Sequence, residues 1–321
     1  MSEIHDLVIW ACGGTGINVS AEIKTSPMTL ALKEAHVVGL DSSDANDGSD
    51  KFAIHRIDGL QGAGKDASKI MDKVRPFAKA IVAKEKPGDH NIVVVNISGG
   101  TGRAMAFCVV KELLDKDQIV TLAMISDFSS VTEKENSIRQ RTALINMINQ
   151  TGKPVTFMEF NEDPEKTRGE VNEEIILGVT LASIFLSKYK TEMETSDLRN
   201  FFNYSYDNKV PPALSRVQFY DEVTAKEYKG KTPVAVASLF LTNSDVRQVF
   251  PGTVYRTTGI MSKENNPPNK LKELHMTLDH GEAQAALEEE IKVLADNKAE
   301  LANRFVKQKD MSKGADDDGF C

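Results

Sequence analysis

The sequence predicts an α/β protein with a mostly parallel sheet, a buried central helix, a second α+β domain and a long C-terminal helix. Three observations predict this fold class. Apolar runs alternate with helical segments over residues 1–170, which is typical of a parallel sheet covered by helices. Two of those runs end in glycine-rich turns that lead into helices. The stretch 175–186 is apolar on every side and too short to span a bilayer, so we expect it between two domains.

The first glycine-rich turn follows the N-terminal apolar run. Residues 7–11 predict a strand, and a helix is expected from about Asn18. Glycine lets the backbone approach an anion, and a helix N-terminus offers free N–H groups and a partial positive charge. We therefore expect a phosphate to bind the turn between them, which consists of Cys12, Gly13, Gly14, Thr15 and Gly16.

Two further loops follow. Strand 36–40 ends in Asp41, whose carboxylate suits a ribose or a hydrated magnesium ion; an Asx turn is the alternative. Residues 59–66 match the spacing of a P-loop, except that Asp66 replaces the Ser or Thr that holds magnesium. We expect a third glycine-bearing loop here and then a helix over 66–84. The expected ligand contacts of that loop are Gly62, Ala63, Gly64 and Lys65.

The second glycine-rich turn lies at 96–103, between strand 92–95 and the helical segment 104–114. Hydroxyl groups add donors to its glycine backbone. A single turn of this kind can also be a tight connection that binds nothing, but two turns that each follow a strand favour a phosphate ligand. A dinucleotide fold is disfavoured, because the third glycine of G-x-G-x-x-G falls on Val19. The expected contacts are Ser98, Gly99, Gly100, Thr101 and Gly102.

The remaining elements follow in order. Strands are expected at 119–125 and 155–160 around a helix over 133–150, and Thr195 or Ser196 is the expected cap of a later helix. Candidate strands at 215–220, 234–241, 254–260 and 271–278 predict a small α+β layer that does not continue the sheet. A long helix is expected over 282–309. The expected divisions are an α/β domain (1–170), a central linker helix (171–190), a second α+β domain (191–280), and the long helix with an acidic tail (281–321).

The order and separation of the two turns resemble those of the tubulin/FtsZ superfamily, which binds GTP. Within it, the sequence is similar to phage-encoded tubulin-like proteins of the PhuZ type over nearly the whole chain. That similarity rests on 13–19, 61–64, 255–261 and the acidic tail. Two positions depart from the family pattern: Ser98 replaces the first glycine of the signature loop, and Arg103 stands where a small residue is usual.

The resemblance implies a GTP/GDP site with magnesium balancing the phosphates. The polar start of the central helix would then face the base. An amide or carboxylate there can pair with the N1–H and N2–H₂ edge of guanine, which adenine lacks. Asn172 and Glu173 are the candidates, together with Asn18; for Glu173 the alternative is a favourable interaction with the helix dipole.

The resemblance also places a hydrolysis loop after the central helix. Its two acids match Glu194 and Asp197, although Glu192 stands where the family has asparagine. In the family these acids reach the nucleotide of the adjacent subunit and position or activate a water. The expected function is therefore a GTPase that polymerises head to tail into dynamic filaments, as a phage cytoskeleton that positions viral DNA in the infected bacterium.

The acidic tail is expected either to be disordered or to dock on a neighbouring subunit, with high salt weakening the contact. The resemblance to the phage proteins favours docking. The expected contacts of the tail are Asp316, Asp317 and Asp318.

The composition limits the alternatives. The net charge of −8 argues against a general nucleic-acid or acidic-membrane binder. The three cysteines are far apart and the six histidines are scattered, so neither a disulfide framework nor a metal site is indicated. The N-terminus has no signal-peptide pattern, and we expect a cytoplasmic protein, in the host bacterium if a phage encodes it.

Two other functions remain open from sequence. A monomeric P-loop-like NTPase would depend on Lys65, so that Lys65→Ala would abolish nucleotide binding. The other is a nucleotide-binding scaffold that is not an enzyme. In that case Asp197→Ala would leave hydrolysis under polymerising conditions unchanged.

Overall fold

The computed structural model describes residues 5–43, 50–60, 70–127, 131–162, 165–266 and 271–313. Two groups of expected contacts lie outside the described residues. These are the third loop (Gly62, Ala63, Gly64 and Lys65) and the acidic tail (Asp316, Asp317 and Asp318).

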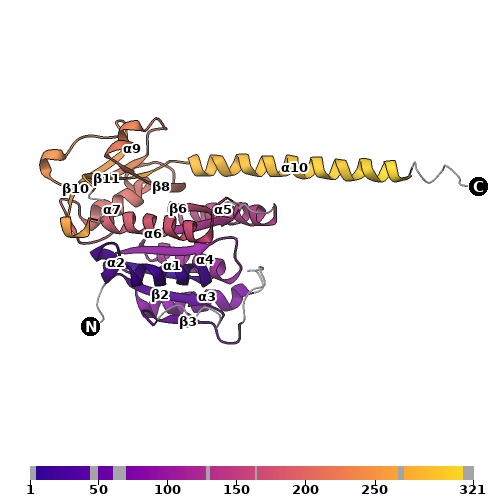
Figure 1. The fold of residues 1–321 in the computed structure, drawn as a ribbon, viewed down its shortest axis with the longest axis horizontal. Helices are drawn as coiled ribbons and strands as arrows, with labels where there is room; N and C mark the ends of the chain where they lie inside the picture. The colour runs from indigo at the N-terminus through magenta and orange to yellow at the C-terminus, as the bar shows by residue number, and fades with distance from the viewer. Residues whose placement is uncertain are drawn as a thin grey trace, which may run out of the picture.

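The first half forms the expected parallel sheet (Figure 1). Strand β1 (Leu7–Cys12) lies inside it, with Ala11 paired to Gly39 on one side and to Val94 on the other. Because β1 and β4 (His90–Asn96) are parallel neighbours in register, the turns that follow them leave the same edge of the sheet side by side. In sheet order the strands are β3 (Ile54–Arg56), β2 (His36–Asp41), β1 (Leu7–Cys12), β4 (His90–Asn96), β5 (Ile119–Asp127) and β6 (Val155–Glu162).

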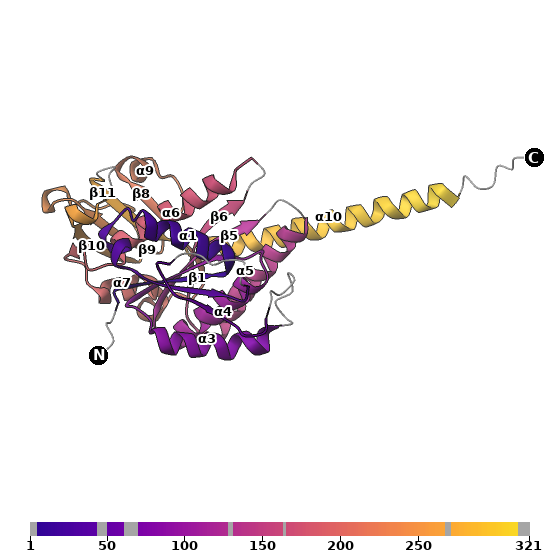
Figure 2. The same cartoon turned by 60° about the horizontal axis from the view of Figure 1, so that its bottom comes forward.

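Helices cover both faces of this sheet (Figures 1 and 2). In β1, Leu7 and Ile9 contribute to one core and Val8 and Trp10 to the other, which explains why the whole run is apolar. One face carries α1 (Gly13–Thr25), α2 (Leu30–Glu34) and α6 (Arg168–Phe185), and the other carries α3 (Met71–Glu85), α4 (Thr101–Asp115) and α5 (Val131–Thr151).

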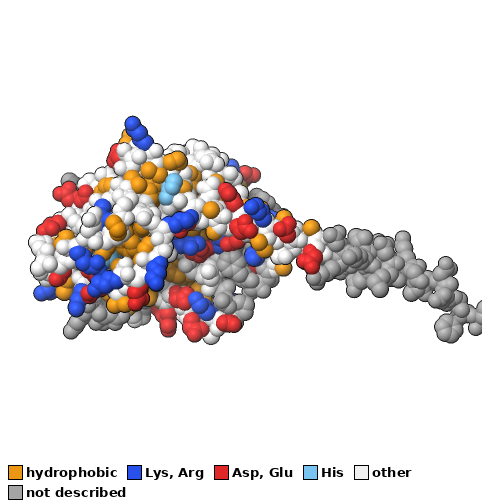
Figure 3. Space-filling view, turned by 90° about the horizontal axis from the view of Figure 1, so that it is seen from above, with side chains coloured by type: hydrophobic (Ala, Val, Ile, Leu, Met, Phe, Trp, Pro, Cys, Tyr) orange, Lys and Arg blue, Asp and Glu red, His pale blue; other side chains and the backbone are white. Residues whose placement is uncertain are grey.

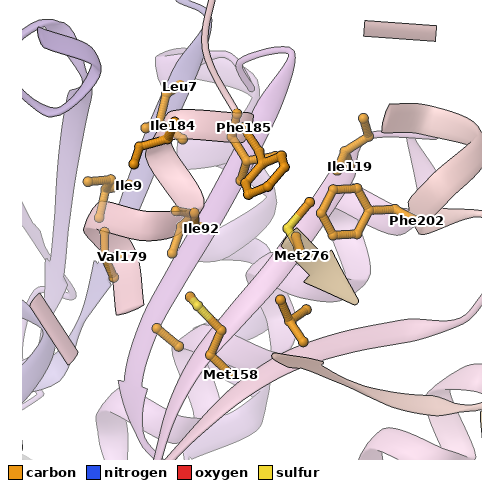
Figure 4. Close-up of a cluster of buried hydrophobic side chains, with 14 of the residues drawn as sticks. Leu7, Ile9, Ile92, Ile119, Met158, Val179, Ile184, Phe185, Phe202 and Met276 are labelled. Carbon is orange, nitrogen blue, oxygen red and sulfur yellow. The ribbon is translucent and has the colours of Figure 1, made fainter. Parts of the chain in front are cut away.

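Helix α6 is the central helix expected from its apolar sequence. A capping box fixes its start: the Thr167 amide donates to Glu170 Oε2 at 2.7 Å, and the Glu170 amide donates to Thr167 Oγ1 at 3.3 Å. Figure 4 shows Val179 and Phe185 of α6 in a cluster with Ile9 and Ile92 of the parallel sheet and side chains from the second half of the chain. The helix therefore joins the two halves through one hydrophobic core.

The second half continues the sheet, so the expected separate layer is wrong. Strand β8 (Leu214–Asp221) pairs through its first residues with β6, where Val155 lies opposite Leu214. Its later residues pair antiparallel with β11 (Glu273–Leu278). One strand thus changes partner along its length, which local sequence does not reveal. Beyond β11 the sheet adds β9 (Ala235–Phe240), β10 (Tyr255–Met261) and β7 (Lys190–Thr191).

Shorter helices complete the second half. Helix α7 (Thr195–Phe202) is capped by Glu194, one residue before the expected cap. Helices α8 (Tyr204–Asn208) and α9 (Glu222–Glu227) follow, with 3₁₀ turns at Asn243–Asp245 and Lys263–Asn265. Among the described residues, the helices lack the combination of length and hydropathy needed to cross a bilayer.

Helix α10 (Glu282–Lys313) projects away from the rest of the molecule (Figures 1 and 2). Ion pairs attach the base of this helix to α5. Arg141 of α5 donates to Glu290 Oε1 at 3.0 Å and to Glu159 Oε1 of β6 at 2.5 Å, and Lys298 of α10 lies 2.8 Å from Glu135. In the view from above, both signs of charge are interspersed with apolar atoms over the body and the base of this helix (Figure 3).

The Arg141 anchor yields a stability prediction. The Arg141 side chain is 5% exposed and Glu159 is 9% exposed, so Arg141→Met leaves a buried carboxylate with Arg216 as its remaining described ion-pair partner. We expect a loss of about 3 kcal/mol in the free energy of unfolding. Urea-induced unfolding followed by circular dichroism measures it.

Lys111→Met is the matched control, because the Lys111–Asp115 pair is 45% exposed on both sides. Its loss should be below about 0.5 kcal/mol. Equal losses in the two variants would contradict an anchoring role for Arg141.

Candidate functional site

The two glycine-rich turns touch through their backbones. Gly13 has φ of 71°, and a Cβ atom on it would lie 2.8 Å from Gly102 Cα. A Cβ on Gly102 would lie 2.9 Å from both Cys12 O and Gly13 Cα. These distances are too short for a side chain, so both positions require glycine.

The helices that follow the turns begin at the same place. A Cβ on Gly16 would lie 2.5 Å from Val94 O, so glycine lets α1 pack directly on β4. Helix α1 begins at Gly13, earlier than the expected start near Asn18, and α4 begins at Thr101. Two helix N-termini thus converge at the carboxyl edge of the parallel sheet, where their free N–H groups and dipoles favour an anion.

A cavity of about 380 Å³ opens beside these turns. Five of its lining residues were expected from sequence, and they come from α1, the second turn and α6. The predicted phosphate and base contacts that meet here are Thr15, Asn18, Ser98, Gly99 and Asn172.

Three polar lining residues were not predicted as ligand contacts. Asn96 ends β4, and its Oδ1 accepts hydrogen bonds from the Ser98 amide at 2.9 Å and the Ser98 hydroxyl at 2.5 Å, which fixes the shape of the turn. Glu133 lies in the first turn of α5 and Arg168 begins α6. Both helices begin at the carboxyl edge of the sheet, which is the sequence signal that could have identified these residues.

Other predicted contacts take different positions. Asp41 is buried and accepts a hydrogen bond from the amide of the next residue, Ser42, at 2.7 Å; an Asx turn would instead use the amide two residues on. Glu173 borders a neighbouring cavity of about 350 Å³ together with Glu22. Cys12 is buried beneath the first turn, and burial raises the pKa of its thiol far above the usual range, so the thiol is neutral. Gly14 and Gly100 lie in the two turns, Gly100 as the N-cap of α4.

The two predicted acids lie at the opposite edge of the sheet, where the parallel strands begin. The Glu194 amide donates to Asp197 Oδ2 at 2.8 Å, and Tyr255 donates to the Asp197 carbonyl at 3.0 Å. On the same helix, Arg199 donates to the carbonyl of Asp117, just before β5, at 2.9 Å. A strand the length of β1 spans about 20 Å, so these acids are far from the cavity of their own chain.

Comparison with known proteins supports one family. No known protein-family profile matches the chain. A phage tubulin-like protein of Pseudomonas phage PhiPA3 is 25% identical over 284 residues, covering 87% of this chain and 86% of the relative. That of Pseudomonas phage 201phi2-1 is 22% identical and covers 96% of both chains.

Solved structures share the fold. A protofilament of TubZ from bacteriophage PhiKZ has a TM-score of 0.79 at 19% identity, covering 92% of this chain and 93% of the other. The phage tubulin PhuZ with GDP has a TM-score of 0.80 at 19% identity, covering 95% and 93%. FtsZ from M. jannaschii has a TM-score of 0.61 at 15% identity, covering 85% and 89%. This chain is therefore similar in sequence to phage tubulin-like proteins over most of its length, and it shares the fold of the solved TubZ, PhuZ and FtsZ structures.

Proposed function

We propose that this protein is a GTPase that assembles head to tail into filaments, with GTP hydrolysed between subunits. One observation carries the proposal: the two glycine-rich turns and the acids Glu194 and Asp197 lie at opposite edges of one sheet. In a head-to-tail polymer, the amino edge of one subunit meets the carboxyl edge of the next. Such a contact does not close and yields an open filament.

Nucleotide binding is supported by the cavity beside the turns. The phosphates would lie at the N-termini of α1 and α4. Asn18 and Asn172 both line the cavity, and their amide oxygens can accept hydrogen bonds from the N1–H and N2–H₂ groups of guanine. Arg168 at the same cavity adds a cation that can offset part of the triphosphate charge.

Hydrolysis requires a water in line with the terminal phosphoryl group. Glu194 and Asp197 would orient or activate that water on the nucleotide of the adjacent subunit. Magnesium would neutralise phosphate charge when bound. Oxygen ligands at the cavity, including Ser98 and Asn96, suit it. Among the described residues no cluster of three or more His, Cys, Asp or Glu could hold a metal ion, so phosphate and water would supply most of its ligands.

The relatives support the proposed filament assembly and the proposed binding of a guanine nucleotide. The similar structures include a TubZ protofilament and a phage tubulin with GDP. By analogy, this chain would act as a filament in the cytoplasm of an infected bacterium and move or position viral DNA. Docking of Asp316, Asp317 and Asp318 on a neighbour is part of the same proposal.

The decisive experiment follows turnover and assembly together. Light scattering and phosphate release are measured with GTP, GDP and ATP over a range of protein concentrations. We expect GTP alone to support assembly and hydrolysis per molecule to rise steeply above a critical concentration. A turnover per molecule that stays constant on dilution would contradict a site shared between subunits.

The backbone contact between the turns predicts the effect of Gly102→Ala. The added Cβ would push the two turns apart, which typically costs about 1–3 kcal/mol. We expect at least a roughly tenfold loss of affinity for a fluorescent GTP analogue. Gly169→Ala is the control, because the nearest atom to its Cβ is Thr167 Oγ1 at 3.8 Å. Similar affinities for both variants would argue against phosphate binding at the turns.

The position of Asp197 predicts that Asp197→Asn separates binding from hydrolysis. Asparagine keeps an oxygen that can accept the Glu194 amide but removes the charge. We expect unchanged nucleotide affinity and a roughly 100-fold fall in polymer-dependent hydrolysis. Asp207→Asn, on the exposed surface of α8, is the control and should retain activity.

Mixing the two defective variants tests the shared site directly. An Asp197→Asn subunit can hold GTP while a Gly102→Ala neighbour supplies intact acids. At a GTP concentration too low to fill Gly102→Ala, we expect the mixture to hydrolyse more GTP than the two variants do separately, with both variants found in the pelleted polymer. Copolymers without regained hydrolysis would place the reaction within one subunit.

A further inference from the structure

The amino edge of the sheet carries several carboxylates besides Glu194 and Asp197. Asp6 directly precedes β1 and Asp89 directly precedes β4. Two backbone hydrogen bonds join these segments: the Asp89 amide donates to His5 O at 3.2 Å, and the His90 amide donates to Asp6 O at 3.0 Å. The edge that would approach a triphosphate therefore carries carboxylates whose negative charge opposes that approach unless cations offset it.

Lys190 is held beside these carboxylates. It lies in β7, where Met261 of β10 is its antiparallel partner, and its ammonium donates to Ser187 O at 2.5 Å. Ser187 lines a cavity of about 360 Å³ together with Asp6. The strand pairing and the carbonyl hydrogen bond hold the ammonium next to the acids.

Electrostatics agree with this placement. Burial lowers the pKa of Lys190 to about 8, against the opposing influence of Asp6, Asp197 and Asp89. Burial lowers the pKa of the neighbouring His90 to about 3, helped by the positive charges of Lys190 and Arg199, so His90 is neutral. At pH 7 Lys190 is therefore mostly charged.

Other cations at this edge are held differently, and Lys153 pairs with Asp117. Arg199 donates to the Asp117 carbonyl. Lys188 is 61% exposed and lies 3.1 Å from Glu34 and 3.9 Å from Asp6. An exposed pair of this kind is screened by water and salt, whereas Lys190 is half-buried and its charge is screened less.

We propose that Lys190 is a positioning residue whose ammonium offsets the carboxylates of the amino edge, so that Asp197 can approach the triphosphate held by the adjacent subunit. This inference rests on the proposed function. Lys190 itself forms no bond to the reacting atoms. It lowers the repulsion between two negatively charged surfaces and holds the Asp197 segment near the neighbour's nucleotide.

The test compares Lys190→Met, Lys190→Arg and Lys188→Met. At pH 7, Lys190→Met should raise the critical concentration and lower polymer-dependent GTP hydrolysis by roughly tenfold each. Lys190→Arg should restore both to within about twofold of the wild type, because it keeps the charge. Lys188→Met should change both by less than about twofold. Affinity for a fluorescent GTP analogue should be unchanged in all three, which also verifies folding.

The pH dependence separates charge from packing. Lys190 has a pKa of about 8. The charged and titratable groups around it are Asp6, Asp89, His90, Asp197 and Arg199. Wild-type hydrolysis in the polymer should fall as the pH rises from 7 to 9, with a midpoint near 8. Lys190→Arg should remove that fall, and Lys190→Met should be low and flat.

The outcomes distinguish this inference from the proposed function. If the wild type neither assembles nor hydrolyses GTP, the proposed function is wrong. If the wild type does both but Lys190→Met matches it, or Lys190→Arg keeps the wild-type pH profile, only the inference about Lys190 is overturned. Failure of arginine to restore activity would likewise overturn a role for the charge.

Discussion

The backbone contact between the turns after β1 and β4 is the constraint on which the site depends. Parallel pairing in register places the ends of these strands side by side, and no room remains for a Cβ on Gly13 or Gly102. The same closeness brings the first turns of α1 and α4 together. This part of the candidate site is therefore built mainly from main-chain groups whose positions the sheet fixes.

Helix α6 connects the cavity at the carboxyl edge of the sheet with the segment that carries the two acids at the amino edge. Its first turns contribute Arg168 and Asn172 to the cavity, and its last residue, Phe185, precedes the segment that carries Lys190, Glu194 and Asp197. A helix of 18 residues is about 27 Å long, which exceeds the roughly 20 Å spanned by a strand of the length of β1. Because it is buried against both halves, it acts as a rigid spacer that sets how far the two acids lie from the cavity of their own chain.

Much of this arrangement could be predicted from sequence, for identifiable reasons. Strands such as β1 are buried on both faces and leave an uninterrupted apolar run, and glycines that cannot bear a Cβ leave a recognisable turn. The path of β8 could not be predicted, because its change of partner from β6 to β11 depends on pairings with strands far away in the chain. Arg168 and Glu133 belong to no local motif, and only the meeting of α5 and α6 at one edge brings them to the cavity.

Helix α10 extends well beyond the body of the protein, and its base lies against α5, which borders the cavity. Glu133 of α5 borders the cavity, and two residues further on Glu135 pairs with Lys298 of α10, while Arg141 pairs with Glu290. The 32 residues of α10 extend about 48 Å from a start beside Gly281, whose φ is 74°. Because ion pairs join α10 to α5 near its base, a tilt of one degree there would displace its tip by about 0.8 Å, so a small movement of α5 would be enlarged at the far end.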